Sequence, residues 1–94
     1  MPLSWRTLST PAFERNTRKI LRRNVRFLRV LERMLAALKE DPYNRSGKHD
    51  IKKLAGLKPG EGQWRIRAGD YRLRYDIFGH DVVLYALRHR KEAY

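Results

Sequence analysis

The sequence predicts an α+β domain in which an N-terminal strand and an antiparallel helical hairpin pack on a small, mostly antiparallel sheet of about four strands. Three observations predict it: apolar residues at helical spacing within 11–40, apolar and charged residues in alternation within 64–75, and an apolar run at 82–87. The helices precede most of the strands, so we expect them on one face of the sheet. Ninety-four residues suffice for one domain, 1–94.

The first two elements are a strand and a helix. Residues 3–9 alternate in part and predict a strand, which we expect to join the edge of the sheet. Thr10 followed by Pro11 marks a helix start, because threonine caps helices and proline favours the first helical position. This helix is expected to end near residue 23.

A second helix follows after a short turn. Its apolar residues recur at helical spacing over 27–38, and it should end before Asp41-Pro42, because the residue preceding proline disfavours helical geometry. The outward face of the helix pair is strongly basic, and either contacts a phosphate backbone or is simply solvated. Its members are Arg15, Arg18, Lys19, Arg22, Arg23, Arg26, Arg29 and Arg33; of these, Arg22, Arg26 and Arg29 are predicted to bind RNA.

The segment 64–75 predicts a two-stranded hairpin around Gly69-Asp70, with a type II′ turn. Side chains alternate between the faces of a strand, so Trp64, Ile66, Leu73 and Tyr75 should share the core face. The opposite face carries Arg65, Arg67, Arg72 and Arg74. Like charges opposite one another destabilise a sheet, which points to an anionic ligand such as phosphate.

The remaining segments are a polar stretch and an apolar strand. Residues 43–58 are polar with turn signals, and 50–54 predicts a short strand or a turn. Within it, Lys52 and Lys53 either bind RNA or flank a surface turn. The run 82–87 is typical of a strand buried on both faces near the centre of a sheet.

Charge narrows the class of partner. Lysine and arginine outnumber aspartate and glutamate by 22 to 10, which gives a net charge of +12. This excess indicates a polyanion, with nucleic acid ahead of an anionic membrane surface, because no segment has a spare apolar face.

The residue types present also bear on cofactors and location. The chain has no cysteine, and its three histidines lack metal-ligand spacing, so no metal and no cofactor are expected. It shows neither a signal peptide nor an apolar membrane span, so a cytoplasmic location without membrane association is expected.

Three motifs in order resemble the RelE/ParE toxin superfamily of type II toxin–antitoxin modules. They are Lys-Lys-Leu-x-Gly at 52–56, Trp-Arg-Ile-Arg-x-Gly-Asp-Tyr-Arg-Leu-x-Tyr at 64–75 and His-Arg-Lys-x-x-Tyr at 89–94. The last motif looks more like the RelE branch. The resemblance implies a RelE-like toxin domain that acts as a ribosome-dependent endoribonuclease, or mRNA interferase, and inhibits translation. It also implies three partners: a cognate antitoxin, the ribosome and mRNA.

The resemblance also implies site residues. Arg65 and Arg67 fall where RelE-type toxins carry basic residues on the second strand, and Arg72 falls on the phosphate-binding arginine of the third. Arg90 and Tyr94 match the C-terminal arginine and tyrosine of the RelE-type active site.

The chemistry would be attack of the substrate's own 2′-hydroxyl on the adjacent phosphate. It needs a base, cations for the charge that develops on the phosphoryl oxygens, and an acid for the leaving group. Arg72, with Arg74 nearby, suits the cationic role. Arginine does not give up its proton in proteins, so His89 is the candidate for proton transfer; alternatively it caps the last strand. Glu61 is a weaker candidate base.

Two other functions stay open. A ParE-like DNA gyrase inhibitor would use the same fold without nuclease activity. A non-toxic RNA-binding relative would retain only the basic scaffold.

Overall fold

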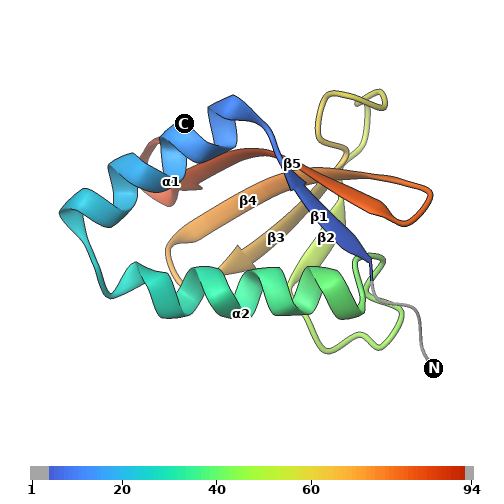
Figure 1. Cartoon of the computed structure of the whole chain (residues 1–94). Coiled ribbons are helices and arrows are strands. Elements are labelled where there is room, and N and C mark those ends of the chain that lie inside the picture. The colour runs from blue at the N-terminus through green and yellow to red at the C-terminus, as the bar shows by residue number, and fades with distance from the viewer. Residues whose placement is uncertain (1–4, 93–94) are drawn as a thin grey trace.

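In the computed structural model, which describes residues 5–92, two helices lie on one face of a five-stranded sheet (Figure 1). The elements in chain order are β1 (Arg6–Ser9), α1 (Pro11–Arg23), α2 (Phe27–Glu40), β2 (Ile51–Lys53), β3 (Trp64–Ala68), β4 (Tyr71–Phe78), β5 (Asp81–His89) and the 3-10 helix η1 (Arg90–Glu92). The strand order is β1-β5-β4-β3-β2. β1 runs parallel to β5 and the other pairs are antiparallel. The predicted α+β class is confirmed.

The start of α1 joins the helix layer to the sheet. The Thr10 hydroxyl accepts a hydrogen bond from the Phe13 amide at 3.2 Å, which makes it the N-cap, and donates one to the Leu84 carbonyl at 2.8 Å. Pro11 occupies the first helical position, where its missing N–H has no consequence. The helix ends at Arg23 as predicted.

The end of α2 is fixed by a carboxylate. Asp41 follows the last helical residue, and its carboxylate accepts hydrogen bonds from the Ser46 hydroxyl at 2.6 Å and from the Arg45 and Ser46 amides. The Ser46 hydroxyl, followed by these amides, lowers the pKa of Asp41. The helix therefore stops before Pro42 and the chain turns toward β2.

The β3–β4 hairpin has the predicted register. Arg67 lies opposite Arg72 and Arg65 opposite Arg74. Gly69 has a φ of +58°, the positive value that a type II′ turn requires at its first central position. Between β4 and β5 the register shifts after Arg74, so that Tyr85 is an extra residue in β5.

Three predicted elements differ in detail. Within the predicted range 50–54, Ile51–Lys53 form the short strand β2, which makes the sheet five-stranded instead of four-stranded. β1 begins at Arg6, and the predicted residues 3 and 4 lie outside the described part of the chain. β5 is internal but not buried on both faces: Val82 and Leu84 are buried beneath the helices, whereas Val83 on the other face is half-buried. No helix of the described residues covers that second face.

The core lies between the helices and the sheet. Met34 and Leu38 of α2 face Leu73 and Tyr75 of β4, and all four are at most 1 % exposed. The Tyr75 hydroxyl donates a hydrogen bond to the Pro42 carbonyl at 2.7 Å, so its burial leaves no polar group unsatisfied. Burial raises the pKa of Tyr75. The helices thus cover one face of the sheet and leave the other face uncovered.

Candidate functional site

Six cationic side chains share the sheet face that the helices leave uncovered. Residues directly opposite in a sheet point to the same side, so the register assigns them. It pairs Lys52 with Arg65, Arg65 with Arg74, Arg67 with Arg72, and Arg72 with Arg88. We call these six residues the basic sheet face. β2, β3, β4 and β5 all contribute to it.

Arg88 is the member that sequence reasoning missed. It lies in β5 directly opposite Arg72 and is exposed. The signal was present in the alternation at the end of β5, where the buried Leu87 precedes it. Only the β4–β5 register shows that Arg88 and Arg72 are neighbours. Arg72 therefore has a guanidinium group on either side of it.

Arg67 and Arg74 of this face are held by hydrogen bonds within the protein. The Arg67 Nε donates to the Asp50 carboxylate at 2.7 Å, and both side chains are about half exposed. The Arg74 guanidinium donates to the carbonyls of Gly62 at 2.8 Å and Glu61 at 2.9 Å. Arg74 thereby binds the loop before β3, and Glu61 is the turn residue whose carbonyl it holds. The Glu61 carboxylate accepts from the Lys58 amide at 2.7 Å.

Arg65 stands out because one of its donors is buried without an acceptor. Its Nε has almost no contact with solvent and no hydrogen-bond partner among the described residues. A buried donor left unsatisfied costs about 1–3 kcal/mol. A bound anion would satisfy this donor. Arg65 is thus one residue of the basic sheet face at which a bound anion would be favourable.

A buried carboxylate anchors the loop that borders the basic sheet face. Asp76 is 1 % exposed, and it accepts hydrogen bonds from the amides of Gly60 at 2.6 Å, Gly62 at 3.0 Å and Gln63 at 2.8 Å. A Cβ on Gly62 would lie 3.3 Å from the Arg74 side chain, so the loop approaches the sheet too closely for a larger residue. Asp76 and Arg74 together hold the loop over β4.

Tyr85, the extra residue in β5, lies beside that carboxylate. Burial raises the pKa of Tyr85, and the charge and hydrogen-bonding capacity of Asp76 raise it further. Tyr85 therefore remains a neutral hydroxyl near the loop.

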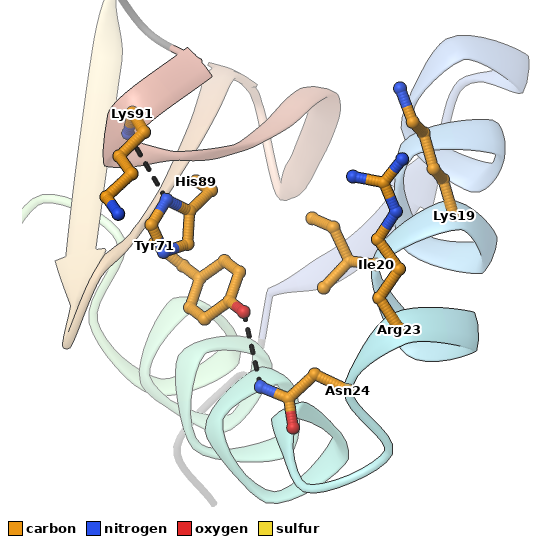
Figure 2. A pocket seen from close by; sticks show the side chains of 7 residues that line it. All are labelled: Lys19, Ile20, Arg23, Asn24, Tyr71, His89 and Lys91. Carbon is orange, nitrogen blue, oxygen red and sulfur yellow. Dashed lines mark hydrogen bonds between the residues drawn. The ribbon is translucent and has the colours of Figure 1, made fainter.

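His89 does not lie on the basic sheet face. It pairs with Tyr71 across β4–β5, and both residues point to the helix side, as the buried Leu73 and Leu87 do. Its Nδ1 accepts a hydrogen bond from the Lys91 amide at 3.2 Å (Figure 2), and its Nε2 lies 3.9 Å from Asp70. The sheet therefore separates the His89 ring from the side chain of Arg72. The strand register thus places His89 and Arg72 on opposite faces of the sheet and does not bring them together in one site.

The C-terminal turn is anchored to the β3–β4 turn. The Arg90 amide donates to the Asp70 carbonyl at 2.6 Å, and the Arg90 Nε lies 3.5 Å from the Asp70 carboxylate. Arg90 thus lies at the end of the sheet, one turn after Arg88. Tyr94, the other predicted C-terminal site residue, lies outside the described residues.

The two lysines of β2 face opposite ways. Lys52 is on the basic sheet face beside Arg65. The Lys53 ammonium lies 5.7 Å from the centre of the Trp64 ring, on the helix side. Only Lys52 therefore joins the basic sheet face.

The basic face of the helix pair is a second, separate cationic surface. All eight of its residues are exposed, Arg22, Arg26 and Arg29 among them. Glu14 and Arg18 form an ion pair on this surface, with 4.0 Å between their charged groups. The helices place this surface on the opposite side of the molecule from the basic sheet face.

Residues 5–92 contain neither a membrane-spanning helix nor a cluster of metal-ligating side chains. Neither helix has the length and apolar character needed to cross a membrane. No group of three or more histidine, aspartate or glutamate side chains in this range is arranged to hold a metal ion.

Comparison with known proteins gives a family match and two structural neighbours. Residues 8–94 match the family model described as the ParE toxin of the type II toxin–antitoxin system, parDE. The toxin–antitoxin complex RelBE2 from Mycobacterium tuberculosis is similar, with a TM-score of 0.69, 25% identity, and coverage of 93% of this chain and 99% of that chain. The RelB–RelE complex from Methanococcus jannaschii has a TM-score of 0.59 and 22% identity over 93% of this chain and 94% of that chain. No curated protein matches the sequence.

Proposed function

Because this chain belongs to the ParE toxin family of type II toxin–antitoxin systems, within the RelE/ParE superfamily, we propose that it is a toxin that cleaves mRNA on the ribosome and thereby inhibits translation. The basic sheet face is the observation that carries the proposal. Adjacent guanidinium groups repel one another, and an anion bound between them would relieve that repulsion.

Phosphate groups of a single RNA strand fit this face. Arg65, Arg72 and Arg88 come from three neighbouring strands, which lie about 4.8 Å apart in a sheet. Guanidinium groups bind phosphate oxygens through paired N–H donors. The Arg65 Nε, which has no acceptor among the described residues, could donate a hydrogen bond to a phosphate oxygen. The face therefore supports several contacts along an RNA backbone.

In the proposed reaction the 2′-hydroxyl oxygen attacks the adjacent phosphorus, and the bond to the 5′-oxygen of the next nucleotide breaks. The products are a 2′,3′-cyclic phosphate and a 5′-hydroxyl, and the proton lost by the nucleophile is balanced by one gained by the leaving oxygen. Arg72, flanked by Arg67 and Arg88, is placed to stabilise the negative charge on the phosphoryl oxygens.

The basic sheet face has few side chains that could transfer a proton, because five of its six residues are arginines. Arginine cannot serve as a base. His89 lies on the helix side and Glu61 holds the loop turn, so neither side chain is directed at Arg72. In this proposal the cationic residues lower the barrier by charge stabilisation, and Arg90 and Tyr94 remain C-terminal site residues by resemblance alone.

The basic face of the helix pair is proposed to bind ribosomal RNA. All three arginines predicted to bind RNA are exposed: Arg22 in the last turn of α1, Arg26 just before α2 and Arg29 in the first turn of α2. With Lys52 and the sheet arginines on the other side, the two surfaces would allow simultaneous contact with the ribosome and with its message. Lys53 adds a cation at the sheet edge.

A cognate antitoxin is the protein partner of such a toxin, and both structural neighbours are complexes of a toxin with its antitoxin. We propose that the antitoxin presents an acidic segment that folds on binding, because the net charge of +12 favours an acidic partner.

Replacement of Arg72 tests the proposed reaction. Arg72→Ala should lower the rate of A-site mRNA cleavage by about 100-fold or more, as expected for loss of a transition-state contact. The measurement is primer extension on a defined message in translating ribosomes. Arg45→Ala is the matched control, because Arg45 is exposed in the loop after α2, where its guanidinium lies over the Tyr43 ring. Cleavage at the wild-type rate by the Arg72→Ala protein would contradict the site assignment.

A DNA gyrase inhibitor is the second candidate, and the match to a ParE family model favours it. The same preparation should then block gyrase supercoiling of plasmid DNA and leave mRNA intact. Running both assays on one sample separates the two functions. A non-toxic RNA-binding protein would be inactive in both assays but would still bind RNA.

A further inference from the structure

A pocket lies on the helix side of the sheet, between the second half of α1 and the ends of β4 and β5. Its volume is about 250 Å³. Figure 2 shows Lys19 and Arg23 of α1 on one side and His89 and Lys91 on the other, with Ile20 and Tyr71 between them. We call it the helix-side pocket. None of its residues belongs to the basic sheet face.

The walls of the helix-side pocket are held in place by hydrogen bonds. The Asn24 side-chain amide donates to the Tyr71 hydroxyl at 3.3 Å, which links the end of α1 to β4. The Tyr71 ring packs against Phe27 at 4.2 Å between ring centres, and against the edge of His89 at 5.2 Å. The His89 ring is oriented by the Lys91 amide. The walls of the pocket are thus held by contacts within this chain.

Its chemistry combines an apolar floor with a cationic rim. Ile20 and the Tyr71 ring supply the floor and pack against the core. Lys19, Arg23 and Lys91 are exposed and carry the positive charge of the rim. The complementary group is an apolar side chain with carboxylates on either side of it. A phosphate would meet the rim but would leave the floor in contact with water.

The volume of the pocket limits the size of the group that it can bind. Sites for whole small-molecule ligands occupy roughly 300–1,000 Å³, and this pocket is smaller. It suits one side chain of a larger partner. RNA bound on the basic sheet face lies on the other side of the sheet and cannot reach it.

We infer that the helix-side pocket is an anchor site for the antitoxin, and that it takes one apolar side chain from an acidic segment of that protein. The inference rests on the proposed function for the identity of the partner as an antitoxin. The carboxylates of the segment would pair with Lys19, Arg23 and Lys91 around the rim. The antitoxin would then be anchored away from the basic sheet face, and it would compete with ribosomal RNA for Lys19 and Arg23 of the helix pair.

The test compares two charge-reversal variants that differ only in position. Lys19→Glu with Arg23→Glu reverses two cations of the rim. Lys39→Glu with Arg45→Glu reverses one lysine and one arginine outside the pocket, both exposed, and alters the net charge equally. Binding of each protein to the small acidic protein encoded by the neighbouring gene, purified separately as the antitoxin, is measured by calorimetry, after circular dichroism shows that both variants are folded.

The pocket variant should bind the antitoxin at least 10-fold more weakly than the control variant. Ile20→Ala, which keeps every charge, should also weaken binding, because the floor would lose apolar contact. Equal affinities in the two charge-reversal variants would overturn the inference. It would also be overturned if the pocket variant lost affinity only for a labelled oligouridylate of about ten nucleotides, since the pocket would then be an RNA site.

These outcomes are separate from those of the proposed function. Antitoxin affinity is measured without ribosomes or message, so a chain that cleaves no RNA still gives a result. Conversely, the wild-type protein could cleave mRNA while the pocket variant binds the antitoxin as tightly as the control variant does. That result would reject the anchor site and leave the proposed function intact.

Discussion

At the scale of single residues, two buried polar groups of β3 and β4 differ in whether they have hydrogen-bond partners. Asp76 is fully buried and accepts three backbone hydrogen bonds, so it stabilises the fold. Arg65 has a buried Nε without an acceptor in the described chain, so it carries a free-energy cost that a ligand can remove. The first is a structural residue and the second indicates a binding site.

Replacement of Asp76 should destabilise the protein strongly. Asp76→Ala leaves the amides of Gly60, Gly62 and Gln63 without their acceptor, and we expect a loss of about 3–5 kcal/mol in the free energy of unfolding. Urea denaturation measures it. Asp50→Ala is the control, because its ion pair with Arg67 is half exposed and should contribute only about 0–1 kcal/mol. Equal losses in the two variants would contradict the role of Asp76.

At the scale of elements, the β3–β4 hairpin and the end of α2 show how short segments set the geometry of the site. The hairpin register follows from its two-residue turn, and it places Arg67 opposite Arg72. The end of α2 follows from Asp41, whose carboxylate closes the turn that leads to β2. β2 in turn brings Lys52 beside Arg65.

The Asp41 turn should make stability depend on pH in the acid range. Its folded-state pKa is below the ordinary value of 3.8, so its contribution is present above that value and is lost as the pH falls through the folded-state pKa. Asp41→Asn should therefore destabilise the protein at pH 7, and its difference from the wild type should shrink below about pH 4. Thermal unfolding across this range measures the effect.

Ser46 supplies the comparison for that experiment. Its hydroxyl is the largest cause of the lowered pKa of Asp41, so Ser46→Ala should reduce the pH dependence without abolishing it. A difference between Asp41→Asn and the wild type that stays constant from pH 7 to pH 3 would show that the carboxylate charge is not involved.

At the scale of the whole molecule, positive charge is distributed over two opposite surfaces. The net charge is +12, and the basic sheet face and the helix-pair surface are separated by the core. This arrangement allows two polyanionic partners to bind at once, which a single patch would not.

The salt dependence of RNA binding should report the sheet surface. Binding to single strands weakens with a slope of about −0.7 per phosphate neutralised, so contacts from Lys52, Arg65, Arg72 and Arg88 predict a slope of about −3 in a plot of log affinity against log salt concentration. Arg65→Ala should reduce the magnitude by about 0.7, whereas Arg45→Ala should leave it unaltered. Fluorescence anisotropy with an oligouridylate measures both. A slope near zero would exclude phosphate contacts as the source of affinity.

Much of the fold was predictable because its determinants are local. Thr10-Pro11 and Asp41-Pro42 set the helix ends, and Gly69-Asp70 sets the hairpin, each through the conformational preferences of two neighbouring residues. The three-residue strand β2 was ambiguous, because so short a segment becomes a strand only when β3 is beside it. The prediction that both faces of β5 are buried was wrong, because a run of apolar residues does not reveal which face of the strand a helix covers.

By itself, the sequence determined the two helices, the hairpin with its row of arginines, and a net charge of +12, since all of these follow from neighbouring residues and composition. Only the tertiary structure decided which cations meet. Strand pairing between β4 and β5 brings Arg88 beside Arg72, and the two-residue alternation along β5 sends the adjacent His89 to the opposite side of the sheet. Such pairings join residues far apart in the chain, and no local preference specifies them.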